Sequence, residues 1–229
     1  MLKFLHTLIL KLFTRKPATL DANYWNDKWK KSPITYNARC IYDTKNVVAA
    51  DVRNFIFPSD VILQKIISDN NLQGITFHDT VQNVQRWAVK NFHYIDDQSE
   101  FAVPEFWQMP FETIDIMVGD CEDVSFVIAS LLRNAGIPAF RVKVACGNVQ
   151  PSSTAPAQGH CYCLFLADDN EWRIIDWCYL PDPEVTVSKK PLAADGGNNN
   201  CYKEVSFTFN DEFSWAGGTI TILDARVKK

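Results

Sequence analysis

The order of helical and extended patterns along the chain predicts an α+β fold, in which helices pack on an antiparallel β-sheet. Apolar residues recur at helical spacing in three segments, at residues 60–67, 79–92 and 120–135. Strand-like alternation follows in the second half, at residues 140–145, 160–167, 171–178, 205–209 and 219–223. Helices followed by strands indicate an α+β fold rather than a βαβ repeat.

The composition predicts one globular domain. The 229 residues are 47% hydrophobic, which is enough for a single large core. The net charge of −4 argues against nucleic acid as the main partner. Seven cysteines, an odd number, include no CxxC pair of the zinc-binding kind and no secreted disulfide pattern. We therefore expect reduced thiols in a cytoplasmic compartment.

Residues 1–31 are expected to form a basic arm, because they hold seven Lys or Arg residues against two Asp residues. Within the arm, residues 1–13 place apolar side chains on one helical stripe. No small-residue cleavage site follows, so we expect no classical secretion signal, and the stretch is too short to span a bilayer. It could pack on its own domain, which we favour, dock on a partner protein or, least favoured, lie on a membrane surface.

The remaining chain is divided into a core at residues 32–184 and a β-rich extension of the same domain at residues 185–229. Residues 17–57 lack periodicity and predict irregular covering structure, and residues 93–118 predict loops. The arm and the extension are the places where an assembly partner would dock.

Capping signals mark the three helices. Ser59 is expected to cap the first helix, and Asp79 followed by Gln82 resembles a capping box for the second. The third helix begins at Asp120 or Cys121. Gly136 then suits a left-handed residue after its end, and the proline at 138 blocks continuation.

Cys121 is the candidate nucleophile, because it lies at the start of the clearest helix. The helix dipole and unpaired N–H groups there favour a thiolate and can stabilise an oxyanion. Most cysteines are buried structural residues, but a cysteine flanked by Asp120, Glu122 and Asp123 is a poor core residue. These acids oppose the thiolate, so an imidazolium is needed nearby.

His160 is the candidate base, since it alone among four histidines follows Cys121 in the strand region. A lone strand histidine is more often a satisfied polar residue, but Asp176 lies in the next apolar strand, where an unpaired carboxylate is costly. A three-residue turn over 168–170 puts Tyr162 opposite Asp176, and His160 becomes a diagonal neighbour of Asp176 on one sheet face. A slip of one residue would separate the two.

These residues lie in motifs that resemble the transglutaminase-like superfamily, and in particular its bacterial cysteine proteinase family. The matching motifs are Trp107-Gln108-Met109-Pro110-Phe111-Glu112-Thr113, Gly119-Asp120-Cys121-Glu122-Asp123, Ala135-Gly136-Ile137-Pro138, Gly159-His160 and Asp176. The resemblance covers about residues 80–180. Stand-alone proteins of this kind occur in bacteria and in bacteriophages, so a phage particle is a second setting for the chain.

The resemblance implies a Cys121-His160-Asp176 triad and hydrolysis of a peptide or isopeptide amide through a thioester. It also implies that Trp107 or Gln108 lines the acyl site and that Gln108 donates to the oxyanion. Some relatives bind calcium beside the nucleophile, at positions that match Asp120 and Glu122. A further acid would help there, but this chain has a serine at 125, and calcium needs six to eight oxygens. We expect no other cofactor.

Three alternatives remain open. Transamidation would replace hydrolysis if an amine rather than water accepted the acyl group. A structural or assembly protein, for example in a phage virion, could keep the fold without its chemistry. A regulated binder could capture a peptide without turnover. A metal site at Cys161, Cys163 and His160 is discounted, because the two cysteines face away from the histidine on a strand.

Overall fold

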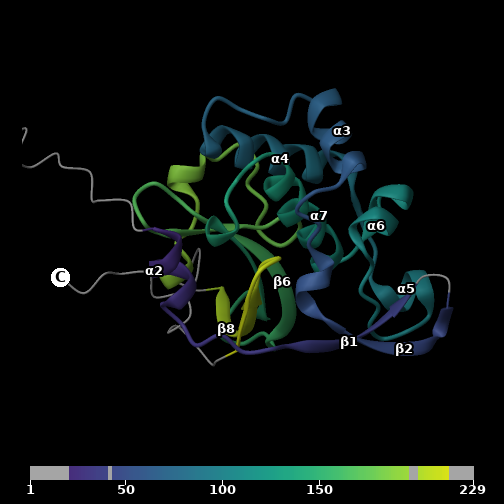
Figure 1. Ribbon diagram of the computed structural model, residues 1–229. Helices are drawn as coiled ribbons and strands as arrows, with labels where there is room; N and C mark the ends of the chain where they lie inside the picture. Colours follow the sequence, from purple (N-terminus) through teal and green to yellow (C-terminus); the bar gives the residue numbers. More distant parts are fainter. Residues whose placement is uncertain (1–20, 41–42, 196–200, 217–229) are drawn as a thin grey trace, which may run out of the picture.

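A five-stranded antiparallel sheet is the centre of the described part of the protein (Figure 1). The computed structural model describes residues 21–40, 43–195 and 201–216. The strand order is β7-β6-β5-β8-β9. The strands are β5 (Val142–Val149), β6 (Gln158–Leu166), β7 (Trp172–Ile175), β8 (Tyr202–Phe209) and β9 (Ser214–Ala216).

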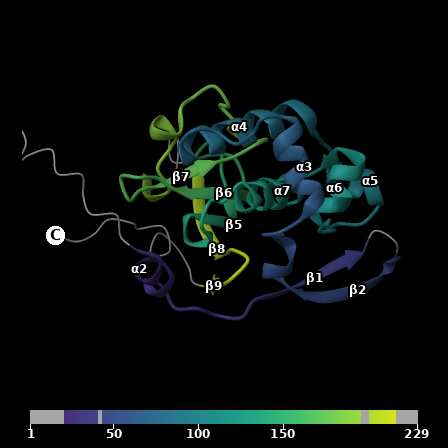
Figure 2. The same cartoon turned by 45° about the horizontal axis from the view of Figure 1, so that its top comes forward.

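Helix α7 (Cys121–Asn134) packs on one face of this sheet, against β5 and β6. Helices α3, α4 and α6 lie around α7, so that it is enclosed between them and the sheet (Figures 1 and 2). Its side chains from Glu122 to Leu132 are all buried, as expected of a helix at the centre of a domain. The helices outside α7 are α2 (Ala22–Asp27), α3 (Val61–Asp69), α4 (Phe77–Asn91), α5 (Asp97–Phe101) and α6 (Pro110–Ile116).

Alternation along β6 supplies two cores, one on each face of the sheet. Cys161, Cys163 and Phe165 pack in the core shared with α7. Tyr162 and Leu164 pack in a second core on the opposite face, which also holds Trp25 of α2. Strand side chains point alternately to the two faces, so β6 is nearly continuously apolar and is a rigid base for the residues at its start.

The predicted third helix and hairpin are confirmed. Helix α7 begins at Cys121, and Gly136 has the left-handed φ of 88° expected after the end of the helix. Strands β6 and β7 pair antiparallel through Cys163 and Ile175, with a hydrogen bond from the Ala167 N–H to the Glu171 carbonyl. The expected strand at residues 219–223 and the helical stripe at 1–13 lie outside the described residues.

Both predicted N-caps are wrong. Helix α3 is capped by Asp60, whose carboxylate accepts from two backbone N–H groups, and not by Ser59. Helix α4 begins earlier than expected, at Phe77. Thr76 caps it and forms a capping box with Asp79, which lies at the third helical position instead of the cap.

The two segments expected to be irregular contain regular elements. Strands β1 (Thr35–Cys40) and β2 (Asp43–Asp51) form an antiparallel hairpin, and η1 (Val52–Phe55) follows. Further along, β3 (His93–Tyr94) pairs with β4 (Val118–Gly119), with α5 and α6 between them. Proline at the first position of α6 is compatible with a helix, because the N–H that it lacks would have no partner there.

The start of the expected strand at 140–145 is also corrected. The 3-10 turn η2 (Ala139–Arg141) comes first, and β5 begins at Val142. Two more 3-10 turns, η3 (Val187–Lys189) and η4 (Ala193–Asp195), follow β7. Among the described residues, none of the helices has the length and the apolar character needed to cross a membrane.

Candidate active site

Cys121 is the first residue of α7, and close packing of the preceding residues against Asp123 fixes its position. Asp123 accepts a hydrogen bond of 3.2 Å from the Asp120 N–H, which closes the first turn of the helix. A Cβ at Gly119 would lie 2.8 Å from the Asp123 Cβ, so this position requires glycine. The short strand pair β3–β4 ends at Gly119 and carries the chain into the helix. The thiol is therefore placed by packing rather than by a flexible loop.

The Cys121 thiol donates a hydrogen bond of 3.1 Å to Glu122 Oε2. Its sulfur also accepts from the backbone N–H of Cys161 at 3.4 Å. Burial, together with the charges of Glu122 and Asp120, raises the pKa of the Cys121 thiol well above its usual value. Burial and the neighbouring acids thus oppose the thiolate that the helix N-terminus favours.

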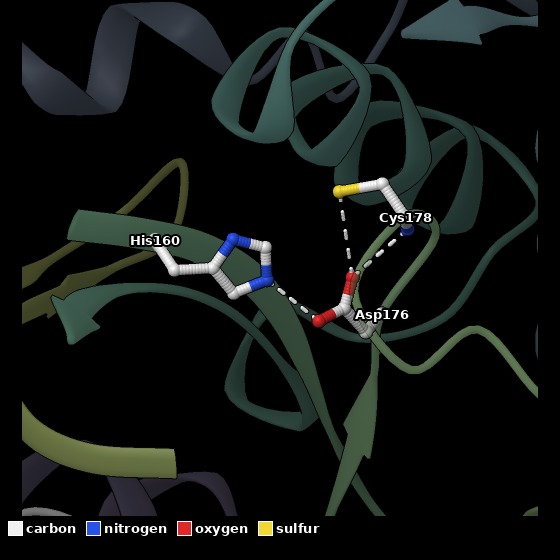
Figure 3. Close-up of side chains that lie close together, drawn as sticks. All are labelled: His160, Asp176 and Cys178. Carbon is white, nitrogen blue, oxygen red and sulfur yellow. Dashed lines mark hydrogen bonds and ion pairs between the residues drawn. The ribbon is translucent and has the colours of Figure 1, made fainter. Parts of the chain in front are cut away.

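His160 and Asp176 form a buried pair, in which His160 Nε2 lies 2.6 Å from Asp176 Oδ2 (Figure 3). Burial raises the pKa of the Asp176 carboxyl, but hydrogen bonds and charge from His160 and a hydrogen bond from Tyr202 outweigh it, so that the pKa is lowered. An ionised carboxylate only accepts, so Nε2 carries the proton and Nδ1 is the nitrogen free to act as a base.

The predicted register brings this pair together. Cys163 faces Ile175 across β6 and β7, and the same register carried one residue further places Tyr162 opposite Asp176. His160 and Asp176 are then diagonal neighbours on one face, as the three-residue turn predicts.

Backbone groups and a tyrosine fix Asp176 from the other sides. Its Oδ1 accepts from the N–H groups of Cys178 and Tyr179 at 3.0 and 3.2 Å. Its Oδ2 accepts from the Tyr202 hydroxyl at 2.7 Å. The backbone carbonyl of Asp176 accepts from the Gln85 side chain at 2.6 Å. The carboxylate is therefore held in one orientation toward the imidazole.

Sequence reasoning missed Tyr202 and Gln85. Gln85 carried a signal, because it is a polar residue on the inward face of α4, beside Val81, Val84 and Ala88. Such a buried amide needs partners, and it finds them in the backbone of Asp176 and Pro181. Tyr202 carried none, since its approach to Asp176 depends on how β8 pairs with β5.

Three tyrosine rings surround His160. The ring centroids of Tyr162, Tyr179 and Tyr202 lie 5.8, 5.4 and 6.3 Å from that of the imidazole. The imidazole therefore packs among aromatic rings as well as against the Asp176 carboxylate.

Cys121 and His160 line one cavity of about 330 Å³. Its other walls include the side chains of Tyr36, Tyr94, Glu105, Trp107, Asp120, Glu122, Cys146, Cys161 and Phe207. A second cavity of about 250 Å³ shares Tyr94, Gly159 and His160 with the first, so the imidazole stands between two hollows. A chain bound across both would pass His160.

Trp107 and Gln108 have different positions. Trp107 lines the first cavity and is also a core residue, stacked on Tyr36 with ring centroids 4.1 Å apart. Gln108 is fully buried, and its amide donates to Asp123 at 3.0 Å and to the Val118 carbonyl at 3.4 Å. Its side chain lies behind the start of α7, so the structure does not support its expected role as an oxyanion donor. The need of a buried Asp123 for donors explains this position.

Acidic side chains gather beside Cys121. The carboxyl oxygens of Asp97, Asp120 and Asp123 lie within 4.8 Å of one another, as do those of Asp97, Glu105 and Glu122. Burial and mutual repulsion raise the pKa of Glu122 and Asp123 well above the usual range, and burial, with Asp97's neighbours, raises that of Asp97 to about 7. Carboxylate oxygens are the donor type that calcium prefers. The expected calcium site at Asp120 and Glu122 thus fits in donor type and stays a prediction.

Comparison with known proteins agrees with this fold. Residues 67–177 match the model of the transglutaminase-like superfamily. No curated protein matches the chain. Among solved structures, Legionella pneumophila LapG matches at 19% identity over 68% of this chain and 86% of that chain, with a TM-score of 0.50. Its calcium-bound form matches at 20% identity over 68% of this chain and 75% of that chain, with a TM-score of 0.49.

The likeness to Legionella pneumophila LapG, with a TM-score of 0.50, shows a shared fold. Cys121, His160 and Asp176 all lie inside the segment that matches the family model, whereas Tyr202 lies beyond it. The α+β architecture, with α7 packed on an antiparallel sheet, is the one that the motifs predict. Residues 67–177, which carry the candidate triad, are therefore similar to the transglutaminase-like superfamily.

Proposed function

We propose that the chain is a cysteine-dependent acyl-transfer enzyme, a peptidase or amidase that acts on peptide or isopeptide amides. Cys121 is the nucleophile, His160 is the base and Asp176 orients the base. One observation carries the proposal: the thiol at the start of α7 and the imidazole held by Asp176 line the same cavity. A nucleophile, a base and a group that orients the base are the parts that covalent acyl transfer needs.

The chemistry begins with the thiol proton. His160 Nδ1 takes it, and the Cys121 sulfur attacks the amide carbonyl of the substrate. Backbone N–H groups at the start of α7 stabilise the oxyanion. His160 then gives its proton to the leaving amine, which leaves a thioester on Cys121. Water attacks the thioester, with His160 as the base again, and restores the thiol.

The hydrogen bond from Cys121 to Glu122 sets a condition on this reaction. The thiol proton is directed at Glu122 in the resting structure, so catalysis requires it to pass to His160 instead. Neutralising the carboxyl group of Glu122, by a proton or a cation, lowers the cost of forming a thiolate beside it. The acidic surroundings therefore restrain the nucleophile until a proton or a cation neutralises Glu122.

Tyr94 is a side-chain donor that can replace Gln108 in the proposed oxyanion site. It lines both cavities, and its backbone pairs with Gly119, next to the start of α7. The residue is 54% exposed, so its side chain is accessible to bound substrate.

Product analysis tests the proposal and separates it from transamidation. Wild type and Cys121→Ala would be incubated with a complex peptide mixture, with and without a primary amine, and the products identified by mass spectrometry. New peptide ends that require Cys121 support hydrolysis, whereas amine-tagged products support transamidation. If neither kind of product forms under any condition, the enzyme proposal is wrong. The chain would then be studied as an assembly protein, an alternative to which the comparisons lend no support.

A further inference from the structure

A second thiol lies beside the His160–Asp176 pair. The sulfur of Cys178, a ring nitrogen of His160 and a carboxylate oxygen of Asp176 all lie within 4.8 Å of one another. Figure 3 shows the three side chains converging, with Cys178 Sγ 3.8 Å from Asp176 Oδ1 and His160 Nε2 2.6 Å from Asp176 Oδ2. The proposed acyl-transfer chemistry uses the histidine and the aspartate and has no use for this thiol.

The three donors match zinc in type and in spacing. Thiolate, imidazole and carboxylate are the three side-chain ligands that zinc binds in proteins. Zinc–sulfur bonds of about 2.3 Å and zinc–nitrogen or zinc–oxygen bonds of about 2.0 Å place tetrahedral donors roughly 3.3–3.6 Å apart. The distance from His160 Nε2 to Asp176 Oδ2, 2.6 Å, lies below this range. The distance from Cys178 Sγ to the other carboxylate oxygen, Oδ1, is 3.8 Å and lies above it. Binding therefore requires His160 and Asp176 to part slightly and Cys178 to approach.

The proposed ligands are accessible from a cavity, and hydrogen bonds from neighbouring residues orient the carboxylate. Cys178 and His160 line the second cavity, of about 250 Å³, through which an ion and a water ligand can enter. The Tyr202 hydroxyl and the Tyr179 N–H fix the carboxylate from behind. Partners that orient the ligands in this way strengthen metal sites.

We propose that His160, Asp176 and Cys178 bind a zinc ion, with water from the cavity as the fourth ligand. The ion takes the place of the proton on His160 Nε2, which moves to Nδ1, and the proton of the Cys178 thiol passes to solvent. A zinc-bound imidazole no longer accepts the Cys121 proton, so the ion is a reversible inhibitor. This last consequence rests on the proposed acyl-transfer function, whereas the binding itself does not.

The experiment must exclude zinc binding at a second cluster of possible ligands, the one that contains Cys121. Asp120, Cys121 and Glu122 also place their donor atoms within 4.8 Å of one another. Zinc affinity is therefore measured in Cys121→Ser protein, by competition with a chromophoric chelator under reducing conditions. The nucleophile is missing from that protein, so failure of the acyl-transfer proposal cannot affect the result.

Two further substitutions are then compared in the Cys121→Ser protein. Cys178→Ser removes a proposed ligand, and Cys201→Ser removes one thiol elsewhere in the second core as the matched control. We expect one zinc ion per chain, an affinity at least roughly tenfold weaker in the Cys178→Ser protein, and no change in the control. Zinc should also slow alkylation of Cys178 by iodoacetamide. Equal affinity with and without Cys178, or no zinc binding by the parent protein, overturns the proposal.

Discussion

The hydroxyl of Tyr202 donates a hydrogen bond of 2.7 Å to Asp176 Oδ2, the same oxygen that His160 Nε2 contacts at 2.6 Å. Tyr202 belongs to β8, beyond the residues that match the superfamily model. The orientation of the Asp176 carboxylate thus depends on β8, in the C-terminal extension, as well as on the β6–β7 hairpin. This arrangement links the C-terminal strands to the candidate chemistry.

Replacing Tyr202 with phenylalanine should reduce turnover while leaving the fold intact. The variant keeps the ring among its aromatic neighbours but removes one donor from a buried carboxylate. Hydrogen bonds to charged groups contribute about 1.5–3 kcal/mol, so we expect a loss of roughly tenfold or more in kcat and a lower free energy of unfolding. Steady-state kinetics and urea unfolding measure the two effects. The control is Tyr24→Phe on α2, and equal kcat in both variants would contradict the positioning role.

Replacing Glu122 with glutamine should make Cys121 more reactive at neutral pH. Burial, followed by the Glu122 and Asp120 charges, raises the pKa of the Cys121 thiol. Glutamine keeps an oxygen that accepts from the thiol but removes the nearest negative charge, so the pKa should fall. The measurement is the rate of Cys121 alkylation by iodoacetamide as a function of pH, followed by peptide mapping. The exposed Glu204→Gln variant serves as the control, and an unchanged midpoint would show that Glu122 does not restrain the nucleophile.

Asp97 should make the protein less stable as pH rises toward neutrality. Burial, then repulsion from Asp120, raises the pKa of Asp97 to about 7, although its carboxylate accepts from the Phe106 N–H. The folded protein binds this proton more tightly than the unfolded chain, whose Asp pKa is about 3.9. Stability contributed by the proton is therefore complete below about pH 4 and is lost as pH rises to about 7.

The Asp97→Asn variant retains an oxygen for Phe106 and removes this titration. Its free energy of unfolding should exceed that of wild type at pH 8 by on the order of 2 kcal/mol, with a smaller difference at pH 5. Urea unfolding at the two pH values measures the effect. A larger advantage at pH 5 than at pH 8 would reverse the sign and refute the assignment.

Lys143 is a buried cation whose removal should stabilise the protein. Its Nζ lies 3.8 Å from the ring centroids of both Trp29 and Trp215 and has no hydrogen-bond partner among the described residues. Burial, and then repulsion from Lys28, lowers the pKa of Lys143 well below its usual value. The tryptophan faces oppose this effect, because they attract the charged form.

Lys143→Met keeps the length of the side chain without the charge. At pH 7 we expect a free energy of unfolding higher by about 1–2 kcal/mol, since the desolvation cost disappears. The unfolded chain binds the lysine proton more tightly, so wild-type stability should rise with pH up to about 10.4. The variant should lack this rise. Thermal unfolding across pH, with the exposed Lys203→Met as the control, measures both effects; a destabilised variant would mean that the cation–π contacts prevail.

Local spacing in the sequence predicted the parts of the site that depend on one helix start and one hairpin. Cys121 follows from a helix with clear end signals, and the His160–Asp176 relationship follows from the turn over residues 168–170. In both cases the relevant residues are near one another in the chain, so periodicity alone fixes their geometry.

Residues that depend on distant contacts were not predictable in this way. Gln108 looked like a free amide in a loop, but its partner is Asp123 on the next helix. Tyr202 reaches Asp176 only because β8 pairs with β5 across the sheet. The β1–β2 hairpin lacks clear alternation in its sequence, so it was not predicted. Its Tyr36 nevertheless contributes to the site, because it stacks on Trp107 at the wall of the first cavity.

The central claim is that Cys121 accepts an acyl group with the help of His160, and an activated ester tests it most directly. Wild type, His160→Ala and Cys178→Ser would be mixed with p-nitrophenyl acetate, with nitrophenol release followed and acetylated cysteines mapped in quenched samples. The account predicts that the acetyl thioester in wild type forms on Cys121 and that its rate of formation collapses in His160→Ala. Acetylation spread over Cys146 and Cys178, or an undiminished rate at Cys121 in His160→Ala, would contradict it.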